Sequence, residues 1–138
     1  MKKVMIAVCS LGLLACGCTK PPPSDVLALQ GNWSGKEADT RHIGSPTMVV
    51  QGTNLEVYEA DTNIWYKANV VLDETKTPKQ MLLLITDSPL SQYVGKRANA
   101  IYQLQDGALT ITANEPGNPS MPANFTSADA RTVVFKHP

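Results

Sequence analysis

Few side chains in this sequence have the types and spacing that a catalytic or metal-binding site requires. His42 and His137 are the two histidines, and neither has a partner at the spacing of metal ligands. Asp39, His42 and Ser45 have the residue types of a catalytic triad, but proximity in sequence is not the geometry that a triad needs. We therefore expect loop polar residues here, with no enzymatic activity, no metal site and no cofactor.

Two pairs of carboxylates are candidates for acid–base chemistry. One pair is Glu56 and Glu59, and the other is Asp73 and Glu74. Alternation of apolar and polar residues places Glu56 on a polar strand face, and Asp73 and Glu74 begin a turn. We therefore expect solvated charges at these positions. The sequence contains no P-loop and no dinucleotide-binding glycine motif.

The three cysteines are confined to the start of the chain. Cys9, Cys16 and Cys18 all lie within the first 18 residues, so the remainder has neither a disulfide nor a thiolate ligand. Two lysines near the start precede a mainly apolar run over 4–15, which suits a signal peptide and is too short to span a bilayer. This pattern predicts an export leader over residues 1–18.

The end of the leader resembles the lipobox of bacterial lipoproteins. In that motif small residues precede a cysteine whose thiol receives diacylglycerol. The run L-L-A-C ending at Cys16 fits best, because Leu13 stands three residues ahead; Cys18, preceded by Gly17, is the second candidate. An ordinary secretory leader is the alternative. The expected partner is thus a membrane, reached through an N-terminal lipid anchor, and the expected location is the cell envelope, with the outer membrane favoured.

A proline-rich tether is expected over residues 19–26. Three consecutive prolines, Pro21 to Pro23, favour an extended polyproline II conformation. Such a segment would hold the following domain, residues 27–138, roughly 20 Å from the membrane. Without the two leader lysines the chain has ten basic and twelve acidic side chains, a net charge of −2, which does not indicate nucleic-acid binding.

The domain shows apolar alternation of period two in short runs bounded by turn residues, which predicts strands. Serial strands with short turns indicate an all-β antiparallel up-and-down barrel. We expect strands at eight places: residues 29–35, 47–51, 54–59, 64–72, 80–86, 99–105, 108–113 and 132–136.

Three segments carry further detail. Asp106 and Gly107 suit a type I′ turn, which would pair Leu104 with Leu109, Tyr102 with Ile111 and Ala100 with Ala113 on one apolar face. The run 81–85 is continuously apolar, so it is either a strand covered on both sides or the start of a short helix. The long segment 114–130, with Met121 and Phe125, is either a lid over an open barrel end or a loop packed on the barrel wall.

The order of motifs resembles a short lipocalin-like domain family of planctomycete-type bacteria. The resemblance implies a lipocalin-like barrel of about eight strands, with Trp33 closing one end and Arg131 or Lys136 covering the indole ring through a cation–π contact. The family often has an arginine before the proline of its late loop, where this chain has Ser120 and Met121 before Pro122. The matching motifs are L-Q-G-N-W at 29–33, G-T-N-L at 52–55, D-E-T-K-T-P-K at 73–79, A-I-Y-Q-L at 100–104, D-G-A-L-T at 106–110 and E-P-G at 115–117, with Pro122 and Phe125.

Two functions follow as expectations. An eight-stranded barrel is wide enough either to be filled by its own side chains or to hold one small ligand. In the first expectation the barrel binds a small apolar molecule, with a lining that includes Tyr66, Val70, Tyr102, Ile111 and Phe125. In the alternative the barrel is filled and contacts another envelope protein through its loops or through Trp65, which lies beside Lys67 on the outward face.

Overall fold

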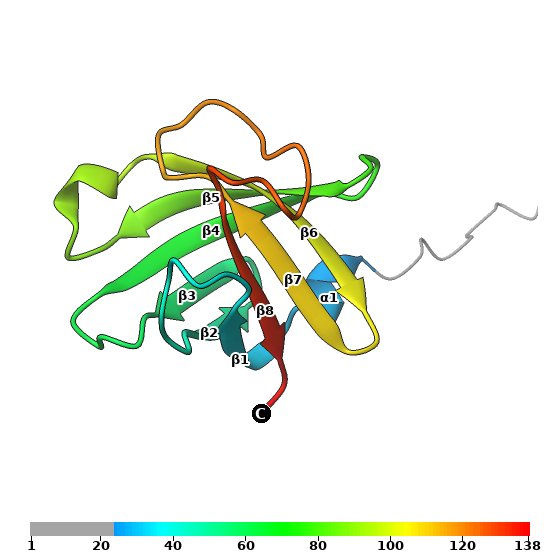
Figure 1. Ribbon diagram of the computed structural model, residues 1–138, viewed down its shortest axis with the longest axis horizontal. Coiled ribbons are helices and arrows are strands. Elements are labelled where there is room, and N and C mark those ends of the chain that lie inside the picture. Colours follow the sequence, from blue (N-terminus) through cyan, green and yellow to red (C-terminus); the bar gives the residue numbers. More distant parts are fainter. Residues whose placement is uncertain (1–23) are drawn as a thin grey trace, which may run out of the picture.

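A computed structural model describes residues 24–138 of the chain. The predicted leader, the two acylation candidates Cys16 and Cys18, and most of the predicted tether lie outside the described residues. Eight antiparallel strands form a closed barrel in which each strand pairs with the next in sequence and β8 pairs with β1 (Figure 1). The prediction of a small all-β up-and-down barrel is therefore confirmed.

The strands lie close to the expected positions. A short helix, α1, precedes them, and a short 3-10 helix, η1, lies between β5 and β6. Gly31 has a φ of 109°, and this conformation, which favours glycine, lets the chain turn from α1 into β1. The elements are α1 (Asp25–Ala28), β1 (Gly31–Glu37), β2 (Thr47–Gln51), β3 (Asn54–Tyr58), β4 (Trp65–Asp73), β5 (Lys79–Asp87), η1 (Ser91–Tyr93), β6 (Arg97–Gln105), β7 (Ala108–Ala113) and β8 (Arg131–Lys136).

The β6–β7 hairpin has the expected register. Asp106 and Gly107 have φ angles of 52° and 75°, as a type I′ turn requires. Leu104 pairs with Leu109, Tyr102 with Ile111 and Ala100 with Ala113. The strand over 81–85 is confirmed as a strand, but only one of its faces is covered, because Leu84 is 45% exposed.

The 114–130 segment lies against the outside of the barrel wall. The side-chain amide of Asn99 donates to the carbonyl oxygens of residues 118, 119 and 120 at 3.3, 3.0 and 3.3 Å. The hydroxyl of Thr132 donates to the Phe125 carbonyl at 3.2 Å and lies 2.7 Å from the Thr112 hydroxyl. These polar positions on the outward face are consequently buried. Figure 1 shows this segment in orange beside β6 and β7.

One end of the barrel is covered by α1. The Asp25 carboxylate accepts hydrogen bonds from Lys79 at 2.7 Å and from the Tyr102 hydroxyl at 2.9 Å. The side-chain amide of Gln30 donates to the carbonyl oxygen of Gly52 and accepts a hydrogen bond from the Gly52 N–H. Asp25 and its neighbour in α1 were assigned to the tether from sequence, yet they belong to the folded domain. Among residues 24–138, no helix is long and apolar enough to cross a bilayer.

Candidate functional site

A cavity of about 770 Å³ opens at the end of the barrel opposite α1. The loops 38–46, 59–64, 88–96 and 114–130 connect the strands at that end. The cavity walls are mainly aliphatic, and polar groups gather where the strands meet the loops. The apolar lining from the strands is Met48, Leu55, Val57, Ala68, Leu83, Ile85, Ala98, Ile111, Ala113, Val133 and Phe135.

Strand periodicity brings three charged side chains to the mouth of this cavity. Glu37 follows the buried positions Trp33 and Gly35 on the inward face of β1. Glu59 stands two residues after Val57, next to the end of β3, and Arg131 begins β8 on the face that buries Val133 two residues later. All three therefore lie at one level of the barrel interior.

Gly35 has a packing role beside this cluster. A Cβ atom at this position would lie 2.7 Å from the Phe135 ring, 2.9 Å from Val133 and 2.9 Å from the carbonyl oxygen of Pro46. The absence of a side chain at this position therefore leaves room for the side chains of Phe135 and Val133 and for the Pro46 carbonyl.

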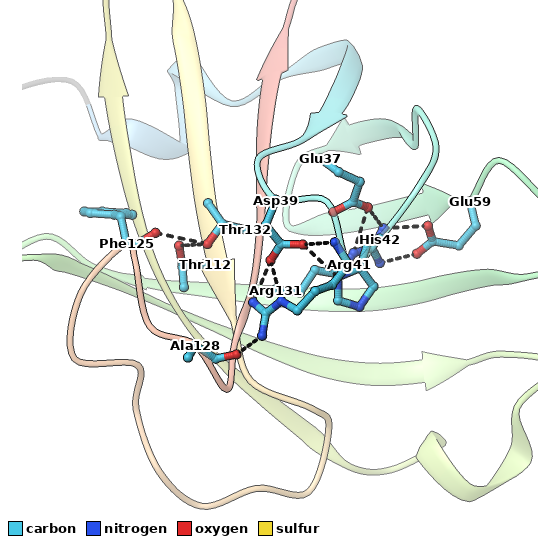
Figure 2. Close-up of polar contacts among 10 residues, drawn as sticks. All are labelled: Glu37, Asp39, Arg41, His42, Glu59, Thr112, Phe125, Ala128, Arg131 and Thr132. Carbon is cyan, nitrogen blue, oxygen red and sulfur yellow. Dashed lines mark hydrogen bonds and ion pairs between the residues drawn. The ribbon is translucent and has the colours of Figure 1, made fainter.

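Arg131 forms ion pairs with both carboxylates (Figure 2). Its Nε donates to Glu37 Oε1 at 2.9 Å, and its two Nη atoms donate to the two oxygens of Glu59 at 2.6 and 2.7 Å. One Nη atom also donates to Glu37 Oε1. The side chains of Glu37, Glu59 and Arg131 are 5%, 15% and 31% exposed, so this is a largely buried, bidentate network.

The charges in this cluster do not cancel. Burial alone would lower the pKa of Arg131, but the hydrogen bonds to Glu59 and then Glu37 outweigh it and raise that pKa above its ordinary range. The guanidinium is therefore charged at neutral pH. Two carboxylates against one guanidinium leave a net charge of −1. Among the described residues, the second oxygen of Glu37, Oε2, is buried and has no hydrogen-bond partner.

Two tyrosines extend the polar end of the cavity. The rings of Tyr66 and Tyr93 are 6.3 Å apart between centroids and inclined at 45°. Burial, followed by the nearby negative charge of Glu59, raises the pKa of Tyr66. The Tyr93 hydroxyl donates to Glu115 at 2.6 Å, which raises the pKa of Tyr93. Both phenols stay protonated at neutral pH and line the cavity.

The five residues expected to line a ligand site are divided by the structure. Tyr66 and Ile111 line the cavity. Val70 is buried in the core outside the cavity lining, and Tyr102 is directed to Asp25 below α1. Phe125 belongs to the segment on the outer wall, so its ring is not part of the lining. The hairpin pattern could not show which part of the inward face remains open.

Trp33 and Arg131 lie at opposite ends of the barrel, so the cation–π contact expected from the resemblance is absent. Trp33 is 3% exposed at the α1 end, and its indole N–H donates to the Leu29 carbonyl at 2.8 Å. The ring that lies against it is that of His137, with centroids 3.8 Å apart. Arg131 starts β8, and the antiparallel pairing of β8 with β1 places it beside Glu37 instead. Lys136 is exposed on the outward face of β8.

The triad-like residues lie in the exposed 38–46 loop. Arg41 contacts Asp39 at 2.6 Å and lowers the pKa of that carboxyl to about 2, and Arg41 also donates to the carbonyl of Ala128 (Figure 2). The arrangement joins two loops at the rim and orients no nucleophile. Residues 24–138 contain no group of three His, Cys, Asp or Glu side chains that could hold a metal ion.

The site residues that sequence reasoning missed are Glu37 and Glu59. Glu59 was expected to be a solvated charge and is instead inside the barrel. A signal was present: Glu37 continues the alternation of Trp33 and Gly35, and Glu59 continues that of Leu55 and Val57. No protein-family model, curated protein or solved structure matches this chain.

Proposed function

We propose that this chain is a lipid-anchored protein of the bacterial cell envelope whose barrel binds one small, mainly apolar molecule. The observation that carries the proposal is the cavity of about 770 Å³ that extends from the barrel interior to the loops around its open end. Ligand sites in proteins typically measure about 300 to 1,000 Å³ and combine apolar walls with a few polar groups. This cavity has both features, which favours ligand binding over a barrel filled by its own side chains.

The lining has a polarity gradient. Side chains such as Met48, Leu55 and Ile111 form the inner walls, where burial of an apolar ligand surface contributes most of the binding free energy. The polar groups Glu37, Glu59 and Arg131 stand near the strand ends. A ligand with an apolar body and one polar end matches this gradient, because the body enters first and the polar end orients it.

Within residues 24–138, this cavity opens at one end of the barrel. The opposite end is covered by α1, held through Asp25, and by the buried side chains of Leu29 and Trp33. The binding site is consequently a blind pocket. The anchor in this proposal rests on the leader and on Cys16 or Cys18 in the sequence.

The experiment is native mass spectrometry of the full-length protein released gently from membranes. The expected result is a second mass species that carries a bound molecule. A matched pair of variants tests where it binds: Ala68→Phe fills the cavity, whereas Asn69→Phe adds the same ring on the outward face of β4. The bound species should be lost with the first and retained with the second. A single unliganded mass under several growth conditions would contradict the proposal.

A further inference from the structure

The cavity carries an excess of negative charge. The guanidinium groups that line the cavity belong to Arg131 and Arg41. Arg41 is already paired with Asp39, which is not one of the lining residues. His42, at the rim, is the remaining basic side chain among the described lining residues. The carboxylates of the lining outnumber them: Glu37, Glu59, Asp61, Glu115 and Asp129. The potential inside this partly enclosed site therefore favours cations.

Arg131 does not offer a site for an anion. All three nitrogens of its guanidinium already donate to carboxylate oxygens of Glu37 and Glu59. A carboxylate or phosphate on a ligand would have to displace one of these bidentate partners and would also face their charge. The arginine thus neutralises part of the negative charge and holds the two glutamates in place.

Glu37 supplies the second, independent observation. The side chain of Glu37 is only 5% exposed, and it lines the cavity. Its Oε1 atom accepts from Arg131, while its buried Oε2 has no partner within the described residues. A buried carboxylate oxygen without a donor is unfavourable, so a ligand donor that this oxygen meets after a rotation of the Glu37 carboxylate is stabilising. A charged N–H donor would be the strongest.

The aromatic side chains agree with this polarity. Tyr66 and Tyr93 both line the cavity, near the carboxylates of Glu59 and Glu115. The face of a phenol ring carries negative partial charge and attracts an ammonium group. An ammonium at this level would therefore lie near both carboxylates and aromatic rings.

We propose that the ligand is a cationic amphiphile, with an aliphatic body in the barrel and an N–H-bearing ammonium group held by Glu37. This inference rests on the proposed function, because it names the chemical class of the molecule that the cavity binds. Insertion of one ammonium group brings the charge of the cluster of Glu37, Glu59 and Arg131 from −1 to zero. The ligand thereby supplies both the missing charge and the missing hydrogen-bond donor.

The test compares three probes with the same aliphatic chain: decylamine, decanol and decanoate, at neutral pH. The full-length protein is held in phosphatidylcholine nanodiscs, and its thermal unfolding is followed at increasing probe concentration. A ligand that binds the native state raises the unfolding midpoint in proportion to its affinity. Decylamine should bind at least about tenfold more tightly than decanol, and decanoate should bind more weakly than decanol.

Three variants locate the effect. Glu37→Gln should bring the affinities for decylamine and decanol to within about twofold of each other, since a tenfold preference reflects one charge-assisted contact. Glu59→Gln should lose less of the preference, because both oxygens of Glu59 are already occupied by Arg131. Glu56→Gln is the matched control on the outward face and should leave the preference unchanged. If Glu37→Gln does not unfold cooperatively, the order of the three probes on the unaltered protein still decides.

The outcomes separate the two proposals. Failure of all three probes to shift the unfolding midpoint would overturn ligand binding itself. Equal shifts by decylamine and decanol, or the largest shift by decanoate, would overturn the cationic class while the cavity remains a binding site. Full preference for decylamine in Glu37→Gln would overturn the role of Glu37.

Discussion

The carboxylate of Asp25 links α1 to two strands of the barrel, through Lys79 and Tyr102. Burial would raise its pKa, but hydrogen bonds from Lys79 and Tyr102 outweigh burial and lower the pKa from 3.8. For Tyr102 the causes act together: burial, then the hydrogen bond to Asp25, raises the pKa above 10.0. The pair is therefore most stable with Asp25 ionised and Tyr102 protonated.

The signs of these shifts predict how stability depends on pH. A lowered carboxyl pKa contributes stability above its unfolded value, and that stability is lost as pH falls below about 3.8. A raised phenol pKa contributes stability that is lost as pH rises above about 10.0. Asp25→Asn should reduce the loss of unfolding free energy at acid pH, and Tyr102→Phe should reduce the loss at alkaline pH. Each variant should lower the free energy of unfolding at neutral pH by roughly 1 to 2 kcal/mol.

The measurement for this prediction is the free energy of unfolding from denaturant titrations between acid and alkaline pH. Asp106→Asn is a suitable control, because this exposed turn carboxylate has no comparable partners and asparagine tolerates its positive φ. If the free energy of unfolding falls equally steeply at acid pH in Asp25→Asn and in the unaltered protein, the proposed role of the Asp25 carboxylate is contradicted.

Single residues also show where sequence reasoning reached its limit. The inward positions of Glu37 and Glu59 follow from alternation, but a charged residue near a strand end is usually solvated. Only the closure of the barrel, which brings β1, β3 and β8 around one interior, makes these two carboxylates neighbours of Arg131. A pairing between strands far apart in sequence is not visible in either strand alone.

At the scale of elements, the strands and the β6–β7 turn were predictable because each depends on local pattern. For 114–130 the sequence left open whether the segment packs on the outer wall or covers the open end, and it did not show which strand residues the segment buries. Asn99, Thr112 and Thr132 are polar residues on an outward face, which is the pattern of an exposed strand surface. Asn99 donates to carbonyl oxygens of this loop and Thr132 to the Phe125 carbonyl, while the Thr112 hydroxyl is paired with that of Thr132.

The attachment of this loop gives a second prediction. Asn99→Ala removes the amide that holds three consecutive carbonyl oxygens, so amide hydrogen exchange over 114–130 should rise while exchange in the barrel strands changes little. The free energy of unfolding should fall by about 1 to 3 kcal/mol.

The control for the loop prediction is Gln103→Ala, an exposed outward position on the same strand. Gln103 makes no comparable contact with the loop, so its variant should leave exchange over 114–130 unaltered. If amide hydrogens over 114–130 are equally protected from exchange in Asn99→Ala and in the unaltered protein, contacts other than those of Asn99 hold the loop in place.

At the scale of the whole molecule, the anchor predicted from residues 1–18 can be tested separately from the barrel. Radiolabelled palmitate should enter the full-length protein when it is expressed in bacteria. The label should be lost in Cys16→Ser and kept in Cys18→Ser, because Leu13 favours the first cysteine. Label retained in both single variants and in the double variant would exclude acylation at either cysteine.

The position of α1 has a consequence for how cargo is exchanged. The helix α1 lies at the covered pole of the barrel (Figure 1), and Ser24 directly precedes it. The pocket opens at the other pole. A lipid attached at Cys16 or Cys18 would thus join the barrel at the pole opposite the opening. A ligand would then enter and leave at the pole remote from the point of attachment, without passing α1.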